Sequence, residues 1–171
     1  APHITEVAGE RIRDELLATL AEAGAKTHLE ALDSLGLLCR VIPELEPSKG
    51  VAQPKEHYWD VFQHSLETVA AVERLLRQGE VDDTAALAPW DAKLEAHFRQ
   101  EVSDGYTRRT ILKLAALLHD IAKPATRTIE ANGRMRFFGH PNVGASMSQA
   151  ALQRLRRKNP MPRHGPGDAC L

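Results

Sequence analysis

The chain has 171 residues, of which 43% are hydrophobic, so it can bury one compact core. Its 22 Lys and Arg residues nearly balance 23 Asp and Glu residues, and the formal net charge of -1 argues against a generally basic nucleic-acid or anionic-membrane binder. No apolar run is long enough to span a membrane, and both cysteines lie outside any Cys-x-x-Cys spacing, which predicts a cytoplasmic protein without membrane contact.

The first 46 residues carry two runs of leucine at helical spacing. One run lies between residues 5 and 25 and the other between residues 28 and 38, and Gly24 separates them. We expect these helices to form a small antiparallel unit. The following stretch, PELEPSKGVAQPKEH, is rich in proline, glycine and charge, which is typical of a loop, so we place a boundary near residue 46.

Helical periodicity returns after this loop and dominates the rest of the chain. The predicted helices cover residues 58–76, 90–102, 106–122 and 143–157. Between them, the acidic stretch 79–88 is expected on the surface, Gly133 is expected in a turn, and RMRFFGH is expected to be extended. The Pro- and Gly-rich tail, residues 159–171, is expected to be disordered. Because no strand-like alternation stands out, the fold class is predicted to be all-α.

The segment LAALLHDIAKP, residues 114–124, is apolar nearly all round and still carries His119 next to Asp120. A buried carboxylate is costly unless a positive or hydrogen-bonding group meets it, and a metal ion is the first candidate. On the helix from Tyr58, an apolar stripe is formed by Phe62, Leu66, Val69 and Leu76. Steps of about 100° per residue place His64 on the flank of this stripe, facing a seam between helices. Imidazole and carboxylate ligands suit several divalent metals, among them Mn, Ni, Mg, Zn and Fe.

Three protein ligands would leave open positions for water or a phosphate oxygen. A divalent metal lowers the pKa of bound water and polarises a phosphoryl group, which is the minimum equipment for phosphoester hydrolysis. Lys123, one turn from His119, would add positive charge against a phosphate oxygen. Taken alone, a histidine such as His64 is more often an ordinary surface or core residue than a metal ligand, and an isolated His-Asp pair can be a helix-terminal hydrogen bond.

The motif LLHDIAKP, preceded by VFQH at residues 61–64 and followed by FFGH at residues 137–140, resembles the HD-domain superfamily of metal-dependent phosphohydrolases. The likeness narrows to the HD region of bacterial tRNA nucleotidyltransferases and poly(A) polymerases. GERIRDEL, LGLL and VIPEL resemble the neck segment that follows the head domain in those enzymes. The resemblance implies an all-α HD bundle with a short N-terminal neck. Residues 1–46 would be the neck, 47–158 an HD domain with a truncated end, and 159–171 the tail.

By this resemblance, His64, His119 and Asp120 take the metal-ligand positions, and His119, Asp120 and Lys123 the catalytic ones. His140 is an additional candidate, because it matches the histidine of a Gly-His-Glu motif in which Pro141 here replaces the glutamate. The family's final aspartate has no helical counterpart, since Asp168 lies in the tail. We expect water, His140 or a neighbouring chain to fill that position.

Two functions follow from the resemblance. The first is a hydrolase of phosphomonoesters or 2′,3′-cyclic phosphodiesters, acting on nucleotides or RNA ends with weak activity. The second is a non-catalytic body that binds tRNA beside a head domain, which this chain lacks. Basic residues before the HD helix and at the end of the last helix would contact RNA, namely Arg108, Arg109, Lys113, Arg154 and Arg156. The retained ligand-type residues favour the hydrolase. Expected partners are the phosphoester substrate, tRNA, and a head domain or second copy.

Overall fold

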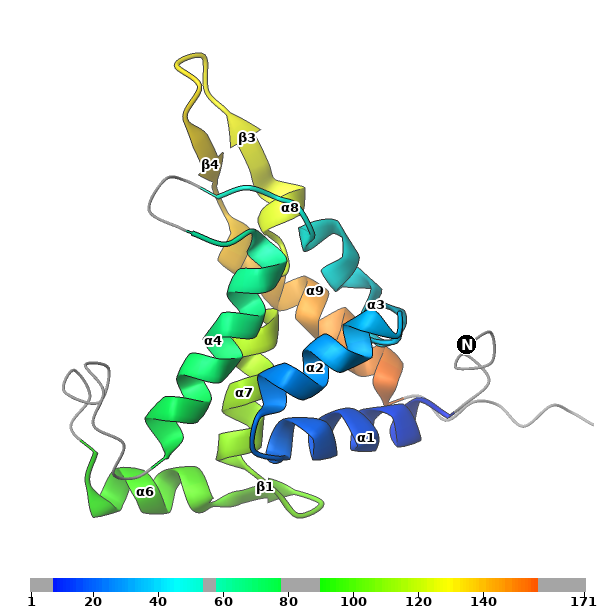
Figure 1. The fold of residues 1–171 in the computed structure, drawn as a ribbon, viewed down its shortest axis with the longest axis vertical. Helices are drawn as coiled ribbons and strands as arrows, with labels where there is room; N and C mark the ends of the chain where they lie inside the picture. Colours follow the sequence, from blue (N-terminus) through cyan, green and yellow to red (C-terminus); the bar gives the residue numbers. More distant parts are fainter. Residues whose placement is uncertain (1–7, 54–57, 78–89, 157–171) are drawn as a thin grey trace, which may run out of the picture.

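The computed structural model describes residues 8–53, 58–77 and 90–156, and within them helices build most of the core. Helices α4 and α7 lie side by side at the centre, α1 and α2 cover one flank, and two small hairpins lie at opposite ends of the molecule (Figure 1). The all-α prediction is confirmed, since the sheets in these ranges have two short antiparallel strands each. No helix in these ranges has the length and apolar character that a membrane span requires.

The N-terminal region consists of helices α1 (Gly9–Ala21) and α2 (Ala25–Ser34), the short helix α3 (Leu38–Val41) and the 3-10 helix η2 (Pro43–Ser48). Gly24 separates α1 from α2 with a left-handed backbone (φ +74°), which only glycine adopts without strain. Helix α1 packs on α7, and α2 packs on α4. The region therefore lies directly against the central helices.

Helix α4 (Val61–Leu76) begins three residues later than the periodicity predicts. Asp60 caps it instead of lying inside it, because the Asp60 carboxylate accepts a hydrogen bond of 2.7 Å from the Gln63 N–H. The predicted apolar stripe is buried as expected. The largest fully buried apolar side chains of the core are Leu20, Leu29, Leu38, Ile42, Leu45, Leu66, Leu117, Ile121, Val61 and Val69.

The predicted helices on either side of residue 104 are both too long at their facing ends. Helix α6 (Ala92–Arg99) ends before strand β1 (Glu101–Ser103), and strand β2 (Tyr106–Thr107) precedes helix α7 (Arg108–Leu118). Asp104 and Gly105 have positive φ angles of 52° and 81°, which form the turn between the strands. A tight turn therefore replaces the helical ends that periodicity suggested.

The predicted helix over residues 106–122, which would carry His119 and Asp120 in its last turn, is too long at its end. Helix α7 stops at Leu118, and a new short helix, α8 (Lys123–Thr126), begins just before Pro124. Proline is tolerated in the first turn of a helix because the N–H it lacks would have no intrahelical partner there. Pro124 therefore starts a helix, and His119 and Asp120 lie in the bend between two helices.

After α8, strands β3 (Arg127–Ile129) and β4 (Met135–Phe137) form a hairpin that pairs Arg127 with Phe137 and Ile129 with Met135. The predicted turn at Gly133 and the extended lead-in are confirmed. Helix α9 (His140–Leu155) starts three residues before the prediction, with Pro141 in its first turn. The predicted surface stretch 79–88 and the tail 159–171 lie outside the described residues.

Candidate metal centre

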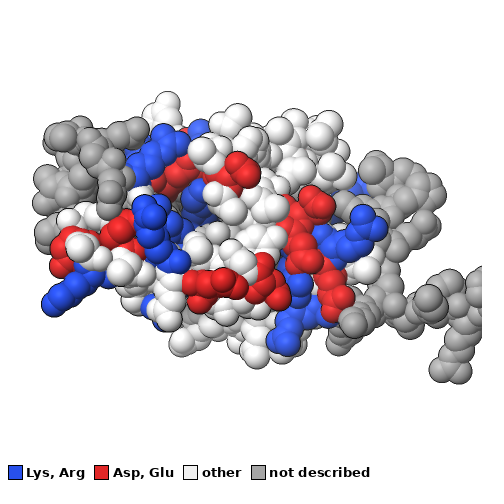
Figure 2. Space-filling model, turned by 90° about the horizontal axis from the view of Figure 1, so that it is seen from below, with Lys and Arg blue, Asp and Glu red and all other residues white. Residues whose placement is uncertain are grey.

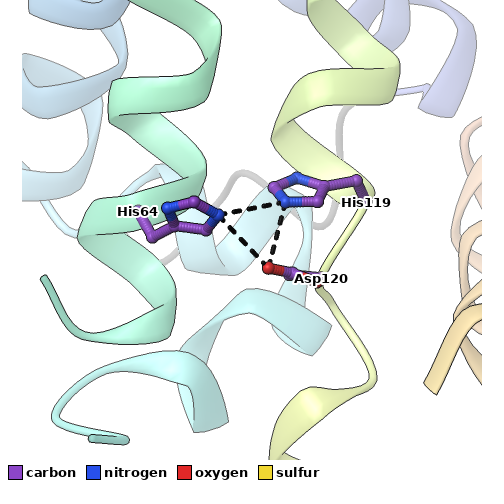
Figure 3. A group of neighbouring side chains, drawn as sticks. All are labelled: His64, His119 and Asp120. Carbon is purple, nitrogen blue, oxygen red and sulfur yellow. Dashed lines mark hydrogen bonds and ion pairs between the residues drawn. The ribbon is translucent and has the colours of Figure 1, made fainter. Parts of the chain in front are cut away.

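Three side chains from two segments meet at one end of the α4–α7 pair (Figure 3). His64 projects from the first turns of α4, while His119 and Asp120 come from the bend after α7. The His119 Nε2 atom lies 3.3 Å from His64 Nε2 and 3.0 Å from Asp120 Oδ2, and His64 Nε2 lies 3.4 Å from the same oxygen. The three ligand-type atoms thus form a small triangle.

Local backbone contacts decide which nitrogen of His119 faces this triangle. The Nδ1 atom lies 2.8 Å from the carbonyl oxygen of Ala116 in the last turn of α7, so Nδ1–H donates there. In the neutral ring, Nε2 then turns its lone pair toward His64 and Asp120, whereas in the protonated ring Nε2–H donates to Asp120. A carbonyl that accepts from one ring nitrogen fixes the tautomer and leaves the other nitrogen for a metal ion. This arrangement is typical of metal-binding histidines.

Asp120 is the most deeply buried member, with 3% of its surface exposed. Burial alone would raise the pKa of its carboxyl, but hydrogen bonds from His119 and Lys123 outweigh burial and hold the pKa well below its usual range. Burial likewise disfavours the charged form of His119, yet the bonds to Asp120 and the Ala116 carbonyl leave its pKa raised. The carboxylate is therefore ionised at neutral pH and available as a ligand.

His140 supplies a third imidazole to the same carboxylate. Its Nδ1 lies 2.8 Å from the Phe137 carbonyl oxygen, and its Nε2 lies 3.5 Å from Asp120 Oδ1, the oxygen opposite the triangle. Helix α9 begins at this residue because Gly139, with φ +77°, turns the chain out of strand β4. The structure therefore brings the additional candidate beside the three predicted ligands.

Lys123 also reaches the carboxylate, with Nζ 2.7 Å from Asp120 Oδ2. The same ammonium donates to Gln53 Oε1 at 2.6 Å. Sequence reasoning missed Gln53, because a glutamine in a Pro- and Gly-rich loop carries no periodicity or motif. Lys123 is mostly buried, so its first role is to hold Asp120 in place.

The donor set fits a divalent cation. Two imidazole nitrogens and one carboxylate oxygen lie within 4.8 Å of one another in the described residues. Their separations of 3.0–3.4 Å suit neighbouring ligands whose bonds to a metal are about 2.0–2.2 Å long. His64, His119 and Asp120 would hold the ion, and the half-exposed imidazoles leave one side accessible to a substrate.

The predicted RNA contacts do not gather into one surface. Lys113 is 6% exposed, pairs with Glu73 at 3.3 Å and donates to the Glu22 carbonyl at 2.9 Å, so this buried lysine is not a surface contact. Arg109 pairs with Glu95 at 2.5 Å, and Arg154 makes a two-point pair with Glu44. Arg108 contacts His97, while Arg156 lies at the end of α9.

On the face around the start of α7, positively and negatively charged side chains are intermixed. Figure 2 shows Lys and Arg side chains alternating with Asp and Glu around a hollow, with no continuous basic surface on that side. Residues of α4, the β1–β2 hairpin and α7 line a cavity of about 360 Å³ there, which includes Glu73, Arg77, Arg109 and Lys113. The cations in it are already paired with carboxylates.

Comparison with known proteins gives two family matches. The family described as "Probable RNA and SrmB-binding site of polymerase A" matches residues 1–49, and the HD domain family matches residues 61–164. The second match covers more than half of the chain and includes all three residues of the triangle.

Two of the individual relatives are tRNA nucleotidyltransferases. The chain is 33% identical over 150 residues to the A-adding tRNA nucleotidyltransferase of Deinococcus radiodurans and 35% identical over 151 residues to the CC-adding tRNA nucleotidyltransferase of Thermus thermophilus. Each alignment covers 87% of this chain and 28% of the relative. The multifunctional CCA protein of Halorhodospira halophila is 28% identical over 158 residues, which cover 91% of this chain and 30% of that protein.

The chain therefore spans less than a third of the length of these relatives, over the region that contains the neck and the HD motifs. The HD family match, the helical architecture and the His64–His119–Asp120 triangle all concern the same part of the chain. This chain belongs to the HD-domain family, with a neck related to that of tRNA nucleotidyltransferases.

Proposed function

We propose that this chain binds one divalent metal ion through His64, His119 and Asp120 and hydrolyses phosphoesters of nucleotides or RNA ends. The observation that carries the proposal is the convergence of two imidazole nitrogens and a buried carboxylate oxygen on one point, with an ammonium group beside them. A bound divalent cation would supply Lewis-acid polarisation of the phosphoryl group and a water of lowered pKa. Phosphomonoesters and 2′,3′-cyclic phosphodiesters are the proposed substrates.

The protein residues have distinct roles in this proposal. Asp120 offers the ligand oxygen and is kept ionised by its hydrogen bonds, while the Ala116 carbonyl fixes the ring of His119. Lys123 uses two donors on Asp120 and Gln53, and because an ammonium group has three donors it retains one for a phosphate oxygen. His140, against the second carboxylate oxygen, would orient Asp120 or complete the ligand set.

A second candidate function is favoured by the family match on residues 1–49, whose description names RNA binding, and by the tRNA nucleotidyltransferase relatives. In this alternative, the neck and HD helices form a tRNA-contacting body of a larger nucleotidyltransferase. The triangle would then be a hydrogen-bonded cluster without catalytic use.

Metal analysis by plasma mass spectrometry separates the two candidates. We expect near-stoichiometric divalent metal in the purified protein, loss of it in His119→Ala, and retention in His28→Ala, which removes an exposed histidine far from the triangle. Hydrolysis of a 3′-phosphorylated oligonucleotide and of a 2′,3′-cyclic nucleotide should follow the metal content. A protein that binds no metal after exposure to manganese, nickel and zinc, yet binds tRNA equally with and without His119→Ala, would contradict the hydrolase and support the second function.

A further inference from the structure

Several exposed apolar side chains lie on segments that adjoin the candidate metal centre along the chain. Eight large apolar side chains are exposed in the described residues, and most of them lie on the segments that border the centre. These are Tyr58, Trp59, Ile129, Phe138 and Val143. Tyr58 is 92% exposed and Phe138 is 70% exposed. Large rings kept in water beside a polar site are typical of a binding surface, because folding alone would favour burying them.

Phe138 borders the centre through the backbone of β4 and α9. It lies two residues before His140, whose Nε2 is 3.5 Å from Asp120 Oδ1. Two residues of fully extended chain span at most about 7 Å. The preceding residue, Phe137, has the Lys123 ammonium 5.6 Å from its ring centre. The Phe138 backbone therefore lies beside the site, and its exposed ring packs on Arg136.

Trp59 borders the centre on another side. The Gln53 amide donates to the Trp59 carbonyl oxygen at 3.2 Å and accepts from Lys123 at 2.6 Å. Lys123 in turn binds Asp120, so one chain of hydrogen bonds ties the segment of Trp59 to the ligand carboxylate. The Tyr58 ring meets that of Trp59 edge to face at 5.7 Å. We call Tyr58, Trp59 and Phe138 the aromatic rim.

Positive charge accompanies the aromatic rim on the β3–β4 hairpin. The hairpin carries Arg127, Arg134 and Arg136 against the single carboxylate of Glu130. The Arg136 guanidinium lies over the Phe138 ring, 5.5 Å from its centre, and also reaches Glu130 at 3.3 Å. In Figure 1 the hairpin rises from the end of the molecule where α8 and α9 begin. Arginines next to exposed rings are the combination that proteins use to bind single-stranded nucleic acids.

We infer that the aromatic rim and the hairpin arginines bind an unpaired nucleic-acid end. A base stacks on Phe138 or Trp59, and the backbone phosphates contact Arg134 and Arg136. The inference rests on the proposed function, because it names the substrate class of the same site: single-stranded ends with free bases. A duplex is disfavoured, because its bases stack on one another and present no free ring face to the rim.

Fluorescence anisotropy with a labelled, 3′-phosphorylated six-nucleotide RNA tests this inference. The measurement is made in EDTA, so that neither metal nor hydrolysis contributes, and a blunt duplex of the same sequence serves as competitor. We expect Phe138→Leu and Trp59→Leu each to weaken single-strand binding about tenfold, since stacking contributes about 1–3 kcal/mol per base. Arg136→Gln should weaken binding and flatten its salt dependence. Leu35→Ala, at an exposed apolar side chain that ends α2, should change nothing.

Equal affinity for the duplex and the single strand, or unchanged affinity in both ring variants, would overturn the inference. Sedimentation velocity tests whether the rim joins two copies of the chain. If Phe138→Leu abolishes self-association but leaves oligonucleotide affinity unchanged, the rim makes contacts between copies and the inference is overturned. Thermal unfolding followed by circular dichroism checks that the variants fold.

Hydrolysis of p-nitrophenyl phosphate, which has no base, keeps the two proposals distinguishable. Leu35→Ala, outside the rim and the metal centre, should leave both that reaction and oligonucleotide binding unchanged, whereas Phe138→Leu should weaken oligonucleotide binding. If no variant and no parent protein hydrolyses p-nitrophenyl phosphate, but single-strand binding still depends on Phe138, then the proposed function fails and the binding surface stands.

Discussion

The antiparallel pair of α4 and α7 holds a buried carboxylate at each end, and the two ends differ in what surrounds the acid. Glu73, on the last turn of α4, accepts from the N–H groups of Gly24 and Ala25 at 2.6 and 3.1 Å and pairs with Arg77 and Lys113. Each of these partners carries a hydrogen-bond donor that it keeps at neutral pH. Such a carboxylate is fully satisfied by the protein and has no reason to take a ligand.

Asp120, at the other end, meets Lys123 and three imidazoles instead. An imidazole nitrogen can exchange its proton for a metal ion, whereas a backbone N–H or a guanidinium cannot. The comparison teaches that burial of an acid does not by itself indicate a functional site. The kind of donor around the acid separates a structural ion pair from a metal centre.

The largest expected effect comes from Asp120→Asn, which preserves the shape of the side chain but removes its charge. Because a ligand oxygen is lost, we expect metal content to fall to background and phosphoester hydrolysis to fall by at least about 100-fold. Plasma mass spectrometry and a hydrolysis assay measure both. Glu73→Gln is the matched variant at the opposite end and should keep its metal. Full metal content in Asp120→Asn would remove Asp120 from the ligand set.

Glu73→Gln should instead lower the free energy of unfolding. It leaves the buried Lys113 without its carboxylate, and breaking a buried pair in this way costs about 3–5 kcal/mol. Urea unfolding measures the change. Glu67→Gln, which breaks a more exposed pair with Lys26, is the control and should cost under about 1 kcal/mol. Equal losses in the two variants would show that burial of Glu73 adds nothing.

Gln53→Ala should weaken metal binding about tenfold while the protein stays folded. The variant removes the acceptor that holds Lys123 at 2.6 Å, and Lys123 in turn holds Asp120. Groups that bond directly to a metal ligand typically contribute about 10–100-fold to metal affinity, so an indirect partner should act at the lower end of that range. Competition with a chelating dye measures the affinity. Gln100→Ala, on the exposed end of α6, is the control. Unchanged metal affinity in Gln53→Ala would mean that Lys123 holds Asp120 without the hydrogen bond to Gln53.

The smallest expected effect concerns pH. Burial would raise the pKa of Glu73, but the N–H groups of Gly24 and Ala25 and the charge of Lys113 together lower it. A carboxyl whose pKa is lower in the folded state stabilises the protein above its unfolded pKa, and this stability is lost as pH falls through the folded pKa. Urea unfolding between pH 6 and pH 3 should therefore show a steeper loss in the parent than in Glu73→Gln. If the stability of the parent and of Glu73→Gln falls in parallel as the pH is lowered, the lowered pKa of Glu73 is contradicted.

Sequence patterns predicted the parts of this fold that depend on one helix at a time. The apolar stripe through Phe62, Leu66 and Val69 followed directly from a 3.6-residue period, and all three side chains are buried. The HD resemblance singled out His64, His119 and Asp120, and the structure brings their ligand atoms within 4.8 Å. That these atoms hold a metal stays a prediction.

Two features that sequence missed depend on contacts between distant segments, and a third depends on the local behaviour of proline. Lys113 looked like a surface cation because its neighbours are basic, but it is paired with Glu73 from another helix. Gln53 lies in a loop, where only the folded structure places it against Lys123. Helix ends near Pro124 were misjudged because proline stops one helix and starts another with equal ease.

The hydrogen bonds from Gly24 and Ala25 to Glu73 have a consequence for how the chain folds. They join residues separated by 49 and 48 positions, across the boundary that sequence motifs suggest near residue 46. Deleting the first helices would strip a buried acid of two donors and uncover the apolar faces of α4 and α7. We therefore expect the neck and the HD helices to unfold as a single cooperative unit, so that the amide hydrogen of Gly24 exchanges with solvent as slowly as those at the centre of α7.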